Sequence, residues 1–287
     1  MMKCPRCELN YIQDDQEACA VCMPPQDTYR RGGAKIPKPR AEGNIAFKCN
    51  YCDGGKNDKQ IGYAGLCSKA NIKENIEVKR RTWCSYPECK CMQYMNGQMT
   101  YEQLASHEAF CYESWVLIDW KASAGEDLKE GDRQGRHRKL SKDVSGGLCV
   151  LTTITPDMKE EKERIIFGVY IADKFEEGED GVVSGFVQCT TKYKIKLAPA
   201  EAKRILFWNY YYNQTDAETA GWASGLFRYV DNYQAAQILR DIVAVKKGTA
   251  DEVLVEEILT EYCRLKNLER KDIPDNNGAL VRVKGGK

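Results

Sequence analysis

The sequence is poor in histidine, and this scarcity excludes a common kind of catalytic site. Only His107 and His137 occur among 287 residues. Neither stands in an H-N-H or H-E-x-x-H pattern, so a metal-dependent nuclease that uses histidine as its general base is not indicated. The Walker loop, the dinucleotide-binding glycine pattern and the GxSxG elbow are missing as well. The chain therefore carries none of these catalytic signatures.

Long apolar runs and a strong net charge are also lacking. No stretch approaches the roughly 18 apolar residues of a membrane span, and the MMKCPRC start has no apolar core of a secretory signal. We expect a cytoplasmic protein without a membrane partner. The net charge of +1 does not by itself indicate a polyanion partner, although local basic patches still could. A composition of 43% hydrophobic and 30% charged residues is typical of a folded globular chain.

Cysteine is the residue in excess, with 14 in the chain. A disulfide scaffold suits small secreted proteins, so metal binding is the better interpretation here. Eleven cysteines lie before residue 112. The other three, Cys149, Cys189 and Cys263, stand in apolar surroundings and are expected to be core thiols.

The first cysteines form two CxxC pairs, Cys4 with Cys7 and Cys19 with Cys22. Two such knuckles supply the four sulfurs of a tetrahedral zinc site. So short a segment cannot build its own core, and the metal would contribute on the order of 10 kcal/mol to folding. We expect a structural zinc ribbon in residues 1–28, with a rubredoxin-like iron site as the alternative. Residues 29–45, rich in Pro, Gly and Arg or Lys, are expected to be a basic linker.

Residues 46–121 are expected to form a second, cysteine-rich metal-binding domain. Its seven thiols exceed the needs of one tetrahedral site. One zinc with spare cysteines, one zinc beside an iron–sulfur cluster, and a binuclear arrangement are all compatible with the spacing, and zinc alone is favoured over iron. The expected metal ligands of the whole chain are Cys4, Cys7, Cys19, Cys22, Cys49, Cys52, Cys67, Cys84, Cys89, Cys91 and Cys111.

A catalytic alternative comes from Glu113, Asp119 and Lys121, which resemble the acid and lysine groups of metal-dependent nucleases. Such groups are more often solvated ion pairs on a helix surface, so we assign no catalytic residue. The protein is more readily interpreted as a non-enzyme; if it is an enzyme, a nuclease is expected. The glycine-bearing stretch 122–142 concentrates positive charge in its second half, where Arg136 and Arg138 are candidate phosphate contacts.

The second half predicts mixed α and β structure over residues 122–272. Apolar and β-branched runs predict strands near 147–153, 164–172, 182–189 and 191–197. In the last of these, Lys192, Lys194 and Lys196 alternate with apolar residues, which predicts one basic face. Apolar stripes at helical spacing predict helices over 231–247 and 251–267. Residues 273–287 are expected to be a flexible tail.

Eight aromatic residues crowd the segment from Phe207 to Tyr229, among Asn, Gly and Ser. A hydrophobic core explains any single ring, but the density of rings favours a pocket on which a planar base stacks. We take this segment, together with basic residues elsewhere, as the nucleic-acid site. Its expected residues are Trp208, Asn209, Tyr210, Trp222, Ser224, Arg228, Tyr229, Lys192, Lys194, Arg136 and Arg138.

The stretches CNYCDGG, LCSKANI, WCSYPECKC, CYESWVLIDW, KYKIKL, FWNYYYN and WASGLFRY together resemble a little-characterised bacterial group with a zinc-ribbon start. The order of elements from about 147 to 246 is similar to the PUA-like superfamily, which includes EVE and ASCH domains. That resemblance implies a small β-barrel with flanking helices, whose cleft accepts a flipped and often modified base.

The expected fold class is therefore α+β, with metal-binding modules preceding a PUA-like barrel. The expected function is the binding of DNA or RNA, with a base, plausibly a modified one, read in an aromatic pocket. The alternatives are a metal-dependent nuclease of a defence system and a metal-stabilised protein–protein adaptor.

Overall fold

The computed structural model describes residues 2–3, 11–12, 42–57, 59–107, 111–127, 135–223 and 225–285. The chain divides into two compact units, residues 1–39 and 40–287. In the first unit, β1 (Met2–Lys3) pairs antiparallel with β2 (Tyr11–Ile12). The four cysteines of the expected zinc ribbon, and most of the expected linker, lie outside the described residues.

The second unit is built around a five-stranded sheet. Two of its strands, β3 and β7, are parallel, and the other neighbours are antiparallel. Every residue of β7 and β8 is buried, as expected for a sheet that is covered on both faces. The strand order is β11 (Lys194–Lys196), β8 (Ile165–Ile171), β7 (Leu148–Thr153), β3 (Asn44–Lys48) and β12 (Phe227–Val230).

A second sheet lies beside the first and has the order β4 (Lys121–Ser123), β10 (Val183–Gln188) and β9 (Lys174–Glu179). The Tyr170 hydroxyl of β8 donates to the Val187 backbone oxygen of β10 at 3.1 Å, which joins the two sheets. A short ribbon pairs β5 (Glu126–Asp127) with β6 (Arg136–His137). The described strands form open sheets and close no barrel, so the α+β class is confirmed without the expected barrel.

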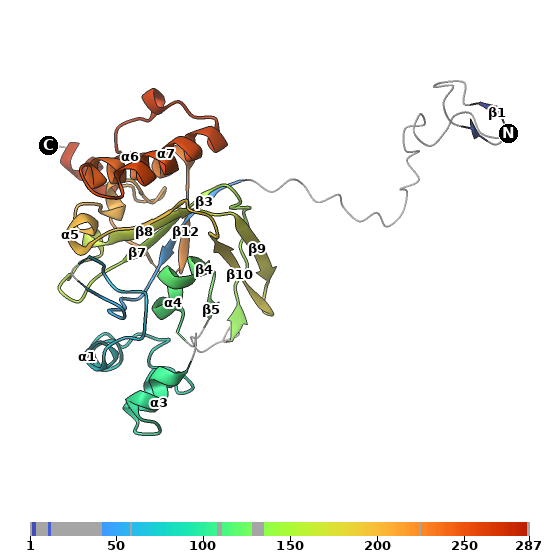
Figure 1. Ribbon diagram of the computed structural model, residues 1–287. Coiled ribbons are helices and arrows are strands. Elements are labelled where there is room, and N and C mark those ends of the chain that lie inside the picture. The colour runs from blue at the N-terminus through green and yellow to red at the C-terminus, as the bar shows by residue number, and fades with distance from the viewer. Residues whose placement is uncertain are drawn as a thin grey trace. The chain divides into compact units, whose positions relative to one another are not determined.

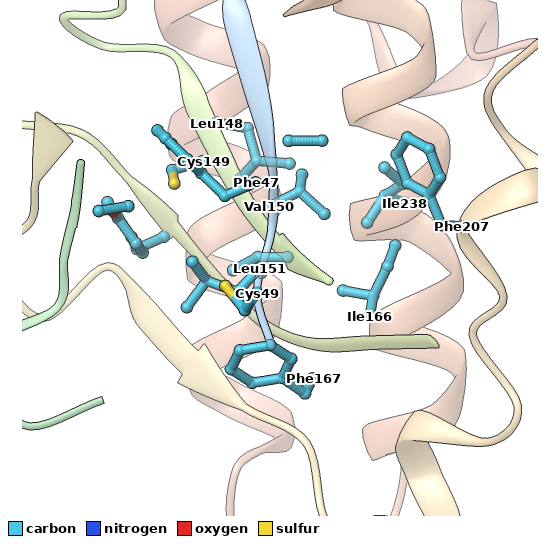
Figure 2. Packing of buried hydrophobic residues seen from close by; sticks show 14 of the residues in the cluster. Phe47, Cys49, Leu148, Cys149, Val150, Leu151, Ile166, Phe167, Phe207 and Ile238 are labelled. Atoms are coloured by element: carbon cyan, nitrogen blue, oxygen red, sulfur yellow. The ribbon is translucent and has the colours of Figure 1, made fainter. Parts of the chain in front are cut away.

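Two long helices, α6 (Asn232–Lys246) and α7 (Glu252–Lys266), cover one face of the five-stranded sheet (Figure 1). The Asp231 side chain caps α6 by accepting from the Gln234 backbone N–H at 2.8 Å. Figure 2 shows Val150 and Ile166 beside Ile238 of α6. The apolar stripes seen in the sequence are thus the faces that the two helices bury, and both predicted helices are confirmed.

The cysteine-rich segment covers the opposite face of the sheet. Tyr63 stacks on Phe167 of β8 with ring centroids 3.9 Å apart, and the Leu117 N–H donates to the Tyr63 backbone oxygen at 3.0 Å. The segment consists of short pieces: α1 (Lys69–Lys73), a π-helical turn (Glu74–Val78), α2 (Lys90–Met95), α3 (Tyr101–Ser106) and α4 (Tyr112–Asp119).

The expected boundaries at 45/46 and 121/122 fall inside one compact unit. Strand β3, just before the cysteine-rich segment, lies between β7 and β12, and β4, just after it, pairs with β10. The segment is therefore tied at both ends to strands of the second half. The remaining short elements are the 3₁₀ turns Glu161–Glu163, Phe207–Asn209 and Arg270–Asp272, with helices α5 (Pro199–Ala202) and α8 (Ala279–Gly285).

The described part of the C-terminal tail, residues 273–285, is packed, which corrects the expectation of a flexible tail. The Gly278 N–H donates to the Asn209 backbone oxygen at 2.9 Å, and the Gln237 amide donates to the Asp275 backbone oxygen at 2.7 Å. Ala279 is fully buried. Backbone hydrogen bonds, which a composition rich in Asn and Gly does not reveal, hold this segment in place.

We expect the substitution Gly278→Ala to lower the free energy of unfolding by about 1–3 kcal/mol. A Cβ at this position would lie 2.4 Å from the Asn209 carbonyl carbon, so the tail would have to move away. Urea denaturation measures the loss. Gly221→Ala is the matched control, because its Cβ would make only an ordinary contact, 3.7 Å from Thr219. Equal stability of the two variants would contradict a packed tail.

Candidate functional site

Six of the seven cysteines in the cysteine-rich segment are linked to one another by side-chain contacts or by electrostatic range, and we call them the thiol cluster. Its members are Cys52, Cys67, Cys84, Cys89, Cys91 and Cys111. Two of them make a close pair, because the sulfurs of Cys52 and Cys67 are 3.2 Å apart in the buried interior. Cys89 and Cys91 form a second pair through a hydrogen bond between their side chains.

The other two thiols lie between these pairs. Cys84 is within electrostatic range of Cys52 and Cys89, one member of each pair. Cys111 is within electrostatic range of Cys52 and Cys91, again one member of each. The thiol cluster is therefore one connected group.

Backbone and amide N–H groups point at several of these sulfurs. The Gly54 N–H donates to the Cys52 sulfur at 3.4 Å, and the Asn71 side-chain amide donates to the Cys67 sulfur at 3.3 Å. The pKa of Cys89 falls to about 6, first because the Cys91 thiol donates to it and further because backbone N–H groups of α2 do so. Such donors stabilise thiolates, the form that binds metal.

Cys49 does not join the thiol cluster, although it shares a CxxC knuckle with Cys52. Its backbone N–H donates to the Thr152 oxygen of β7 at 2.9 Å, so the residue continues the sheet, and its thiol lies 4.0 Å from the Tyr112 hydroxyl. Figure 2 shows it among core side chains. Burial, followed by the nearby Glu113 charge, raises the pKa of this thiol. The structure gives Cys49 the surroundings of a core thiol.

Within the described residues, no three Cys, His, Asp or Glu side chains converge on a point that could hold a metal ion. The buried carboxyl group of Glu113 contacts the thiol cluster, because the Cys111 thiol donates to it at 3.8 Å. Its other oxygen accepts from the Asn50 N–H at 3.3 Å. Burial raises the pKa of Glu113, while Arg81 opposes that shift.

The acid and lysine residues of the nuclease alternative are not brought together. Glu113 is buried in the first turn of α4, whereas Asp119 is exposed at its end, about 9 Å further along the helix axis. Lys121 is exposed, and its ammonium lies 3.7 Å from the Phe186 ring centroid. Neither exposed residue shares a cavity or a contact with Glu113 in the described structure, so the geometry offers no such active site.

The aromatic segment is a core, which corrects the expectation of an open pocket between its rings. Trp208, Tyr210 and Trp222 are each at most 1% exposed. Trp208 meets Trp222 edge to face, with centroids 6.3 Å apart, and the Tyr210 hydroxyl donates to Asp241 at 2.9 Å. The rings cover one another's faces, so in this structure a base has no access to them.

The remaining aromatic-segment candidates have structural partners. The Tyr229 hydroxyl accepts from the backbone N–H groups of Ser141 at 2.9 Å and Lys142 at 3.1 Å. Half-buried Asn209 holds the C-terminal tail through its backbone oxygen. Ser224 lies outside the described residues.

The basic residues expected to bind phosphate are mostly neutralised. Arg136 pairs with Asp180 at 3.7 Å, and the Arg138 guanidinium donates to Asp127 at 2.9 Å. Lys192 pairs with Glu257 at 2.6 Å. Lys194 is half-buried on edge strand β11. A cation that already holds a carboxylate offers less to a phosphate, so these residues do not make a strong polyanion surface.

Four other cations gather at one end of the five-stranded sheet, and we call them the basic cluster: Lys48, Arg81, Arg164 and Arg228. Lys48 ends β3, Arg164 stands just before β8, and Arg228 is the second residue of β12. Because β8 runs antiparallel to β7 and β12 antiparallel to β3, these termini meet at the same edge of the sheet.

Trp222 connects two members of the basic cluster. The guanidinium carbons of Arg164 and Arg228 lie 4.9 and 5.7 Å from its ring centroid. Arg228 also donates to the backbone oxygens of Trp222 and Phe227, and the Lys48 ammonium donates to the Ala223 oxygen at 3.3 Å. The residues just before β12 thereby fix the cations in position.

Positive charge in the basic cluster is only partly compensated. The pKa of Lys48 is lowered, first by burial and then by the charges of Arg164, Arg81 and Arg228, while Glu161 opposes this. The Glu161 carboxylate is held by Arg164, whose guanidinium donates to both its oxygens. Among the described residues, no carboxylate makes an ion pair with Lys48, Arg81 or Arg228. An anion would relieve this repulsion.

Arg81 adds an unsatisfied donor, because its buried Nε–H has no partner among the described residues. A buried donor without a partner costs free energy, and an unseen ligand is one ordinary explanation. Arg81 also connects the two groups of residues, since its charge acts both on Lys48 and on the Cys84 thiol. Sequence inspection missed Lys48, Arg81 and Arg164, since each is a single cation at the end of an element.

A cavity of about 500 Å3 lies elsewhere, between Tyr51, Ile61 and Pro199. Three of its charged groups are already engaged: Asp53 accepts from Ser68 at 2.6 and 2.8 Å, and Asp157 pairs with Lys203 at 3.0 Å. The basic cluster is the stronger candidate for ligand binding, because its cations are not satisfied in this way.

Comparison with known proteins adds no assignment: no protein-family model, curated protein or solved structure matches the chain. No helix in the described parts of the chain is long and apolar enough to cross a membrane.

Proposed function

We propose that this chain is a nucleic-acid-binding protein whose basic cluster holds backbone phosphates. The observation that carries the proposal is the meeting of four cations at one sheet edge, three of them without a carboxylate partner among the described residues. Guanidinium groups match phosphate oxygens in geometry, and contacts to phosphate fix the register of a protein on its nucleic acid.

The scaffold suits this task. Lys48 and Arg228 lie on paired strands. The side chain of Arg164 is 3% exposed, and contacts with Glu161, Thr152 and Trp222 fix its orientation. Cations held in place lose little conformational entropy when an anion binds. The proposed site is therefore a rigid anion site, made of one buried cation and three more accessible cations, and not a mobile basic loop.

Base reading is the narrower part of the proposal. The buried rings are unsuited to it, so the candidate ring becomes Tyr211, which is half-buried and within electrostatic range of Arg228. A relation to the PUA-like superfamily also remains a hypothesis. It is supported by the order of β7, β8, β10 and β11 along the chain, which is the order expected from the sequence, and by the contact between the two open sheets. A cytoplasmic location and DNA or RNA as partner belong to the same proposal.

Fluorescence anisotropy of the full chain with labelled single-stranded DNA, duplex DNA and RNA tests the proposal at several salt concentrations. We expect Lys48→Gln and Arg228→Gln each to weaken binding and to reduce the slope of log affinity against log salt by about 1. Lys192→Gln is the control, because Lys192 is an exposed cation already paired with Glu257. It is expected to change neither quantity appreciably.

Thermal unfolding of each variant shows whether a loss of binding reflects a loss of fold. Salt-insensitive binding, or equal losses in the control and the two site variants, would count against the basic cluster. Modified and unmodified oligonucleotides test base reading separately. Cleavage of plasmid DNA with magnesium or manganese would favour the nuclease alternative, and absence of any nucleic-acid binding would favour the adaptor.

A further inference from the structure

The thiol cluster contains six thiols, which is more than one tetrahedral metal ion can bind. A tetrahedral zinc ion takes four thiolates, and two separate ions would need about eight. Six thiols serve two ions only when two of the thiolates are shared. We propose that the thiol cluster holds two zinc ions in one centre, in which Cys84 and Cys111 each bind both ions.

The arrangement of the sulfurs assigns the other four ligands. Cys52 and Cys67, with sulfurs 3.2 Å apart, bind one ion together. Cys89 and Cys91, two residues apart at the start of α2, bind the second. Each bridging thiol is within electrostatic range of both pairs: Cys84 of Cys52 and Cys89, and Cys111, at the start of α4, of Cys52 and Cys91.

Cys49 is excluded from the centre by its place in the fold. Its backbone extends the pairing of β3 with β7, and its side chain packs in the core beside Tyr112. The CxxC pattern at Cys49 and Cys52 is therefore not a zinc knuckle in this protein. Only its second thiol faces the other cysteines.

Binding releases one proton from each of the six thiols and involves no change of oxidation state. Two zinc ions with six thiolates carry a net charge of about −2. The N–H groups of Gly54 and the Asn71 side chain already donate to the sulfurs, and Arg81, whose buried Nε–H has no partner among the described residues, lies within electrostatic range of Cys84. These groups supply the compensation that a buried dianionic centre requires.

The ions have to draw the thiols together, because no three ligands converge within the described residues. The local structure permits that movement. Of the six cysteines only Cys91 lies within a helix, the helices of this part of the chain have five to eight residues each, and the stretch from Val78 to Cys89 contains turns in place of longer helices. Coupling of metal binding to local ordering is usual for cysteine-rich modules.

Metal and sulfide analysis of the purified full chain tests the centre. The double variant Cys4→Ser with Cys7→Ser removes the zinc expected in residues 1–28, so about two zinc ions per chain should remain. In that background, Cys84→Ser should reduce the content of both ions together, whereas the control Cys49→Ser should leave it unchanged. One zinc per chain, iron with acid-labile sulfide, or metal loss in Cys49→Ser would each overturn the proposal.

A spectroscopic readout covers the case in which Cys84→Ser fails to fold. Cobalt(II) replaces zinc in thiolate sites, and two cobalt ions that share thiolate bridges couple magnetically. We expect the paramagnetic resonance signal per cobalt to fall as the second ion enters the double-variant protein. A signal that grows in proportion to cobalt up to saturation would show separate ions and would contradict bridging. Neither measurement depends on nucleic-acid binding.

Discussion

Removal of metal from the purified protein is expected to unfold the segment from Cys52 to Asp119 while strands β7 and β8 stay folded. The helices of this segment span only five to eight residues, and isolated helices shorter than about 12–15 residues are marginal in water. Structural zinc contributes on the order of 10 kcal/mol in small modules. Hydrogen exchange of the backbone amides, before and after chelation, measures the change.

The protection of amides in α1 and α4 should collapse, and amides of β7 should lose little. Restoring zinc should return the protection. The double variant Cys4→Ser with Cys7→Ser should behave identically in this segment, since the monitored amides belong to the second compact unit. Unchanged exchange in α1 after the metal is stripped would show that packing alone, such as Tyr63 on Phe167, suffices to hold the segment.

The second large effect is expected from Trp208→Ala, which should lower the free energy of unfolding by about 3–5 kcal/mol. Trp208 is fully buried and contacts the rings of Phe207, Tyr211 and Trp222. The substitution removes a large apolar side chain and leaves a cavity that the surrounding rings cannot fill. Urea denaturation measures the loss.

Trp83→Ala provides the comparison, since Trp83 is 36% exposed and, among the described aromatic residues, stacks on Tyr86 alone. It should cost about 1 kcal/mol or less. Binding of nucleic acid by the folded fraction of Trp208→Ala should stay near that of the parent chain. A stable Trp208→Ala protein that fails to bind would restore the pocket interpretation and contradict the core interpretation.

The pattern of apolar residues along the chain predicted many of the strands and both long helices. The apolar run before Thr153, the run from Ile165 to Ile171 and the stripes of α6 and α7 were readable because each element buries a continuous face. Strands β3 and β12 were not predicted. Each is short, at five and four residues, and their pairing joins segments more than 170 residues apart.

Cysteine spacing identified the cysteine-rich segment by itself, and it predicts metal binding there because tetrahedral ions need several thiols. Spacing did not decide which thiols meet. Cys49 and Cys52 belong to one CxxC motif, yet the first continues a strand and the second lies in the loop just before the turn at residues 54–55, so only the second joins the thiol cluster. Ring density likewise identified the aromatic segment without deciding whether its rings face solvent or one another.

Sequence alone thus determined several of the strands, both long helices, the cysteine-rich segment and the apolar faces, since these depend on neighbours along the chain. Only the tertiary structure decided the basic cluster. Lys48, Arg164 and Arg228 are isolated cations in the sequence, and strand pairing in the order β8, β7, β3 and β12 brings them to one edge. Their mutual repulsion, and with it the anion affinity that we propose, exists only once those strands are paired.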